Sequence, residues 1–217
     1  MSSTTSPTLQ VCRECGGGAP VDAHFCPQCT KILSLGRHGD YFAFLGIPRH
    51  LTFDAAELDQ RFRDLSRQFH PDYFYNATPA ERRASLDRSS YLNDAYRTLK
   101  NPVMRAEYLL RLEGLNATAS ATPPGLLEEV FALNEELDEI RALRASGAPR
   151  DEVAARLATA REPIERKRDQ HEADLKALSA KWDATGDRQV LEALRDRVLE
   201  RNYITNLLDG IERELSA

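Results

Sequence analysis

Two neighbouring segments in the first half of the chain each carry apolar residues at helical spacing. The first stripe is Leu58, Phe62, Leu65 and Phe69, and the second is Leu86, Ser89, Tyr91, Leu92, Ala95, Tyr96 and Leu99. Side chains three or four positions apart share one face of a helix. The pattern therefore predicts two antiparallel helices, and we expect the first stripe to pack on Leu92, Tyr96 and Leu99.

Capping residues mark where these helices begin and end. Thr52 or Asp54 is a suitable N-cap for the first helix, and Thr78-Pro79-Ala80-Glu81 combines an N-cap, an early proline and an acid in the first turn. Asn101-Pro102 ends the second helix, because proline lacks the N–H group that a helix interior needs. A shorter helix is expected over 40–46, which closes on a glycine.

Three further seams of apolar residues follow residue 125. They are Leu126, Val130, Leu133, Leu137 and Ile140; then Val153, Leu157, Ala160, Ile164, Leu175, Leu178 and Trp182; then Leu191, Leu194, Val198, Ile204, Leu208, Ile211 and Leu215. Breaks at 146–149 and 185–187 separate the seams, and a Thr/Ala/Pro-rich stretch at 116–124 precedes them as a linker. The pattern predicts a three-helix bundle. A coiled-coil dimer is the alternative, although short loops favour folding back within one chain.

A His-Pro-Asp tripeptide, residues 70–72, lies between the two helices of the predicted hairpin. Pro71 cannot continue the first helix, so the chain must turn at His70 and the turn is rigid and exposed. Arg63, Arg67 and His70 line a face that is distinct from the apolar stripe. Alone, the tripeptide is a common loop sequence and the arginines are an ordinary solvated face, so the context of the motif decides its meaning.

That context resembles a J domain. The segments Tyr41–Gly46, His70–Asp72, Asn93–Leu99 and Pro102–Leu110 carry the resemblance, and the last two are more specific than the tripeptide. More narrowly, they resemble the HscB family of J-type co-chaperones for iron–sulfur cluster assembly, and with the bundle the resemblance covers about 40–217. The chain departs from the family at Tyr73, where a lysine or arginine is usual.

The resemblance implies a chaperone-binding surface made of Arg63, Arg67, His70, Pro71 and Asp72. This surface is expected to contact an HscA/DnaK-class heat-shock chaperone and to stimulate its ATPase by allosteric activation. The chain itself is then not an enzyme. A catalytic-base role for His70 is disfavoured, because His70 lies on an exposed turn.

The resemblance also implies a scaffold-binding surface on the bundle. The segment 134–139 resembles the family helix that contacts the IscU-type cluster scaffold, and the matching contact positions are Leu127, Phe131, Glu135 and Tyr203. The alternative is that Leu127 and Phe131 are core residues and that Glu135 is a solvated acid. The chain departs from the family at Glu128, which is typically apolar, and at Asn134, which is typically basic.

All four cysteines form two Cys-x-x-Cys pairs, Cys12/Cys15 and Cys26/Cys29. Two such pairs suit one tetrahedral metal ion, and we interpret them as a structural zinc site; bound iron and a redox dithiol are the alternatives. A four-cysteine site has no open coordination position, so catalysis at the metal is disfavoured. We expect His24 at the surface rather than among the ligands. The module is interpreted as a folding nucleus, a dimer contact or a docking surface.

Composition limits the classes of function. The 217 residues include 41% hydrophobic and 29% charged residues with a net charge of −5, which disfavours a nucleic-acid binder. No apolar run is long enough for a membrane span, and the first eleven residues do not resemble a secretory signal. We expect a cytoplasmic protein. The mitochondrial matrix is the alternative. Mitochondrial relatives of the HscB family carry a similar double knuckle, so the metal module is consistent with the resemblance.

Together these patterns predict an all-α protein with a zinc-knuckle module. The predicted parts are a tail and zinc module at 1–39, a J domain at 40–115, a linker at 116–124 and a three-helix bundle at 125–217. The predicted function is that of an iron–sulfur co-chaperone, with a homodimer possible in principle. The alternatives are a generic J protein for unfolded clients and a zinc-ribbon nucleic-acid or redox module with a coiled-coil tail.

Overall fold

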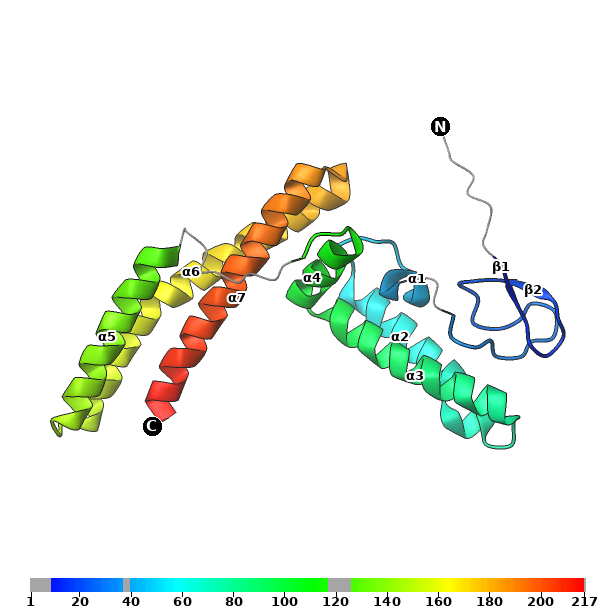
Figure 1. Cartoon of the computed structure of the whole chain (residues 1–217), viewed down its shortest axis with the longest axis horizontal. Coiled ribbons are helices and arrows are strands. Elements are labelled where there is room, and N and C mark those ends of the chain that lie inside the picture. The colour runs from blue at the N-terminus through cyan, green and yellow to red at the C-terminus, as the bar shows by residue number, and fades with distance from the viewer. Residues whose placement is uncertain (1–8, 37–39, 117–125, 217) are drawn as a thin grey trace. The chain divides into compact units, whose positions relative to one another are not determined.

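The structure is a computed structural model that describes residues 9–36, 40–116 and 126–216. Its described residues form two compact units, one up to Arg105 and one from Ala106 onward (Figure 1). The all-α class is confirmed, since α-helices dominate both units. The predicted linker at 116–124 lies outside the described residues apart from Asn116, so the predicted domain boundaries stay predictions.

The first described residues form a small element that the apolar pattern did not predict. Strands β1 (Leu9–Val11) and β2 (Gly18–Pro20) pair antiparallel, with Leu9 opposite Pro20 and Val11 opposite Gly18. A second loop closes through an isolated bridge between Phe25 and Ile32. Strands of three residues are too short for an alternating pattern to emerge, which is why periodicity missed them.

Helix α1 (Tyr41–Leu45) ends at the predicted glycine cap and also has an N-cap that was not predicted. The Asp40 carboxylate accepts a hydrogen bond of 2.9 Å from the backbone N–H of Ala43. Gly46 closes the helix with φ of 66°, a left-handed conformation that glycine adopts at low cost.

Helices α2 (Ala55–Phe69) and α3 (Pro79–Lys100) form the predicted hairpin, and a 3₁₀ turn η1 (Pro71–Phe74) connects them. Asp54 is the N-cap of α2, and Thr78 with Glu81 forms a capping box at the start of α3. The rings of Phe62 and Tyr96 stack at a centroid distance of 4.1 Å, which confirms the expected packing.

One member of the second stripe was assigned wrongly. Leu86 is 54% exposed, while Ser85 and Arg88 are buried beside Leu92. The core-facing register of α3 therefore includes the polar residues Ser85 and Arg88. Because they are polar, the apolar pattern of the sequence did not reveal this register.

Helix α4 (Pro102–Leu112) follows α3 almost directly. The Asn101 side chain caps it, because its Oδ1 accepts hydrogen bonds from the backbone N–H groups of Val103 and Met104. Its buried residues include Leu109 and Leu110.

Three long helices form the predicted bundle: α5 (Leu127–Ala145), α6 (Arg150–Thr185) and α7 (Arg188–Ser216) (Figure 1). Their shared core contains buried members of all three seams, namely Leu126, Leu133, Leu137, Ile140, Val153, Leu157, Ile164, Ile204 and Ile211. Arg156 on α6 bonds Glu136 on α5, and Arg141 on α5 bonds Glu214 on α7. No described helix combines the length and the apolar character that a membrane crossing requires.

Candidate functional site

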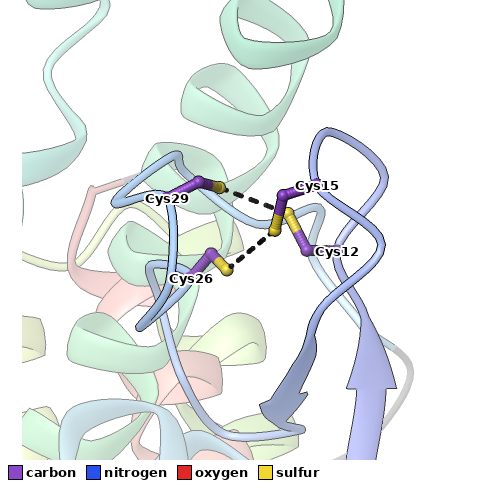
Figure 2. Close-up of side chains that lie close together, drawn as sticks. All are labelled: Cys12, Cys15, Cys26 and Cys29. Carbon is purple, nitrogen blue, oxygen red and sulfur yellow. Dashed lines mark hydrogen bonds between the residues drawn. The ribbon is translucent and has the colours of Figure 1, made fainter.

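The four cysteines converge on one point (Figure 2). Their sulfur atoms all lie within 4.8 Å of one another, and the Cys12–Cys29 and Cys15–Cys26 sulfur pairs are each 3.7 Å apart. Tetrahedral Zn–S bonds of about 2.3 Å place sulfur atoms about 3.8 Å apart. The cluster therefore fits one tetrahedral divalent ion.

Matching backbone turns position the two cysteine pairs. The carbonyl of Cys12 accepts a 2.9 Å hydrogen bond from the N–H of Gly16, and the carbonyl of Cys26 accepts one of 2.9 Å from the N–H of Thr30. Each turn places two sulfur atoms on one side of the loop. Gly16 has φ of 73°, which favours glycine at that position.

The thiols of the cluster influence one another. Backbone N–H groups of Cys29 and Gln28 stabilise the Cys26 thiolate and lower its pKa to about 7. At Cys29 the N–H of Lys31 acts in the same direction, but burial and the other cysteines outweigh it and raise the pKa to about 12. Four adjacent thiols therefore resist losing all their protons unless a cation neutralises them.

The expectation that His24 is a surface residue was wrong. Its ring lies between Phe44 and Phe69, with centroid distances of 4.8 and 4.9 Å. Arg88 donates a 2.8 Å hydrogen bond to His24 Nδ1, so Nε2 carries the proton and donates to the carbonyl of Phe44 at 3.1 Å. Burial and then the Arg88 charge lower the pKa of His24 to about 4, which keeps the ring neutral. The residues that contact His24 lie far from it in the sequence, so no local pattern predicted these contacts.

The predicted chaperone-binding residues lie together at the end of the hairpin. His70 is exposed and caps η1, because its Nδ1 accepts from the N–H of Asp72 at 3.4 Å. The side chains line an open depression of about 460 Å³, formed by Phe62, Arg63, Ser66, Arg67, His70, Asp72 and Tyr73. Pro71 is the first residue of η1 and is also exposed.

The residue before the turn is firmly anchored. Phe69 is fully buried, and its carbonyl accepts hydrogen bonds from the hydroxyl groups of Ser85 at 2.6 Å and Ser89 at 3.0 Å. Sequence reasoning missed Ser85. Its position in the helix could have indicated that it is buried, since residue 85 is seven positions before the buried Leu92 and lies on the same helix face.

The predicted scaffold-binding residues divide into two groups. Leu127, Phe131 and Glu135 lie four positions apart on α5 and are exposed, Leu127 by 42% and Phe131 by 67%. The alternative that Leu127 and Phe131 are core residues is therefore wrong. Tyr203 on α7 is half-buried and packs against the bundle core. The contacts of all four with a scaffold stay predictions.

Comparison with known proteins agrees with this geometry. The DnaJ domain model matches residues 40–108. Human co-chaperone protein HscB has a similar structure with a TM-score of 0.70 and 26% identity, covering 94% of this chain and 98% of that chain. Chaperone HscB from Vibrio cholerae has a TM-score of 0.60 and 29% identity, covering 81% of this chain and 97% of that chain. The matches give the chain a DnaJ domain and a fold similar to that of both HscB proteins. With the turn at 70–72 and the cysteine cluster, they support an HscB-type J-domain co-chaperone.

Proposed function

We propose that this protein serves iron–sulfur cluster assembly by delivering an IscU-type scaffold to an HscA/DnaK-class chaperone and stimulating the chaperone's ATPase. The observation that carries the proposal is the presence of two exposed surfaces, one on each of two separate units. One surrounds His70 at the end of the hairpin, and the other contains Phe131 on α5. Each partner then has its own surface on one chain.

The chaperone surface combines charge with a fixed turn. Arg63 and Arg67 are exposed on α2 and offer positive charge to an acidic surface. Exposed charges of this kind speed encounter and fix orientation more than they add affinity. His70 and Asp72 then bias the chaperone toward its hydrolysis-competent state, and no bond is made or broken by this chain.

The scaffold surface is apolar with a polar border. An aromatic side chain that is 67% exposed, such as Phe131, offers little to the stability of the bundle but fills a partner's pocket well. Glu135 follows one turn later and supplies a polar contact. Apolar anchors with a polar rim suit a transient interface.

Zinc is the metal that we propose for the cysteine cluster. Cys12, Cys15, Cys26 and Cys29 would hold it through four thiolates, a soft and closed ligand set that zinc accepts in structural sites. When bound, the ion supplies cross-linking and charge neutralisation rather than reactivity. The residues of the cluster hold the two loops together around it.

ATPase turnover of the chaperone tests the proposal. It is measured with this protein alone, with the protein plus an IscU-type scaffold, and with His70→Gln in both conditions. We expect stimulation that needs His70 and that rises further with scaffold. Stimulation without scaffold synergy would reduce the function to that of a generic J protein, and no stimulation of any cognate chaperone would refute it.

A further inference from the structure

Arg88 on α3 is a cation with unusual surroundings. It is only 2% exposed. Its guanidinium donates hydrogen bonds to the carbonyls of Leu33 at 2.8 Å, Ser34 at 3.3 Å and Ala23 at 3.4 Å, and to the His24 ring at 2.8 Å. These partners are neutral groups, and burial lowers the pKa of Arg88 to about 10.

All of these acceptors belong to one loop, residues 23–34, which also contains Cys26 and Cys29. A buried cation is tolerated only when hydrogen bonds replace the water that it has lost. The loop must therefore be folded for Arg88 to remain buried. Because a closed metal site of this kind usually folds with its ion, metal binding and burial of Arg88 are linked.

The same loop covers the residue that precedes the His-Pro-Asp turn. The ring of Phe69 lies 4.9 Å from the ring of His24 and 6.1 Å from that of Phe25, measured between centroids. The Arg88 guanidinium carbon lies 5.7 Å from the Phe69 centroid. Loop 23–34 and Arg88 thus enclose the side chain that ends α2.

A second contact reaches the other side of the turn. Lys31 Nζ forms a 3.0 Å ion pair with the carboxylate of Glu81, which is buried. Glu81 also completes the capping box with Thr78 at the start of α3. The hydrogen bond from Lys31 is the main cause that lowers the pKa of Glu81. Loop 23–34 therefore contacts the residues on both sides of the 70–72 turn.

We propose that Arg88 is a positioning residue that couples the cysteine module to the His70-Pro71-Asp72 turn, so that the folded, metal-loaded module keeps the turn in its active conformation. The effect on the chaperone rests on the proposed function above. The coupling itself is a property of this chain alone. It assigns the module a task within the J domain, in place of the three roles that the sequence left open.

The coupling has a distinct kinetic signature. When only a fraction of the molecules holds the turn correctly, the apparent affinity for a partner falls by that fraction. The plateau at saturation is unchanged, because the partner selects the ordered molecules. Loss of coupling should therefore raise the concentration of co-chaperone that gives half-maximal stimulation. Loss of His70 itself should instead abolish the plateau.

Amide hydrogen exchange tests the coupling without any chaperone. The protein is compared with and without zinc, and as the variant Cys26→Ser/Cys29→Ser. We expect amides of 66–76 to exchange at least about tenfold faster without the metal, and amides of α6 and α7 to be unchanged. Unchanged exchange at 66–76 in a protein whose module has lost protection would overturn the proposal.

The reciprocal experiment substitutes the J domain and measures the module. Linkage requires that Arg88→Met lower the zinc affinity of the cysteines, by about tenfold, in competition with a chromophoric chelator. Arg83→Met is the matched control, because Arg83 lies on the same helix but is exposed and pairs with Asp87. Equal zinc affinity of the two variants would contradict the coupling.

Two further measurements keep the result interpretable. If Arg88→Met fails to fold, the variant Lys31→Ala takes its place, because it removes only the ion pair to Glu81. We expect Lys31→Ala to speed amide exchange only near the start of α3. Unchanged exchange there would count against the second contact. In the ATPase assay, Arg88→Met should raise the half-maximal concentration and leave the plateau intact. If the wild type stimulates no chaperone, the proposed function fails while exchange and zinc affinity still decide the coupling.

Discussion

The hydroxyl group of Ser85 donates a 2.6 Å hydrogen bond to the carbonyl of Phe69, and both residues are fully buried. Phe69 ends α2 and Ser85 lies in α3, so this bond joins the two helices directly beside the turn at 70–72. A buried carbonyl that loses its donor keeps the desolvation cost of burial. The bond is therefore part of what fixes the turn.

Substitution of Ser85 should destabilise the hairpin. We expect Ser85→Ala to lower the free energy of local unfolding by about 1 kcal/mol relative to Ser90→Ala. The loss is limited to this size because Ser89 retains one hydrogen bond to the Phe69 carbonyl. Ser90 is exposed on the same helix, so both variants share the gain in helix propensity. Exchange of the core amides of α3 measures the difference. Equal values for the two variants would show that the bond contributes nothing.

The helices could be predicted because their signals are local. Apolar spacing and caps at Asp40, Asp54 and Thr78 lie within a turn or two of the structure that they specify. The environment of His24 could not be predicted in this way. Its partner Arg88 is 64 positions away, and no local pattern joins a histidine in a knuckle to an arginine on a helix.

The functional sites could likewise be predicted only where their sequence signals are local. The cysteine cluster was evident, because ligand spacing within each pair is local and the chemistry of four thiols is specific. Ser85 and Arg88 were missed, because polar residues in a core-facing register carry no apolar signal. Their register relative to Leu92 is the clue that sequence reasoning had available.

Phe131 should contribute to scaffold binding and little to stability. We expect Phe131→Ala to weaken scaffold binding at least about tenfold, as loss of a central aromatic anchor does. Thermal unfolding of the bundle should barely change, since the ring is 67% exposed. Tyr75→Ala is a matched control, because Tyr75 is 78% exposed but belongs to the J domain. Isothermal titration with an IscU-type scaffold measures both variants, and equal affinities would exclude Phe131 from the interface.

Cobalt substitution should reveal the geometry of the cysteine site. Replacing the native metal with Co²⁺ should give one ion per chain with the intense visible bands of tetrahedral thiolate coordination. Cys15→Ser should shift these bands and weaken binding, because a hydroxyl group is a poorer ligand than a thiolate. Weak bands of octahedral type, or no binding by the reduced protein, would contradict a four-thiolate site at Cys12, Cys15, Cys26 and Cys29.

The bundle should lose stability in mild acid because of His171. This residue is buried on α6, and burial lowers its pKa despite the Glu200 carboxylate on α7, which lies 3.4 Å from Nδ1 without hydrogen-bond geometry. Arg197 and Lys167 also lower the pKa, whereas Asp174 raises it. Since the folded state holds the ring neutral, the unfolded chain binds the proton more tightly.

The sign of the effect follows directly. Above the ordinary histidine pKa of about 6.5, neither state carries the proton and the full stability is present. As the pH falls below that value, the unfolded chain gains a proton first and the free energy of unfolding of the bundle decreases. Urea unfolding followed through Trp182, which lies on α6, measures this decrease between neutral and mildly acidic pH. The variant His171→Gln should flatten the profile over that range, and an unchanged slope would assign the pH dependence to other groups.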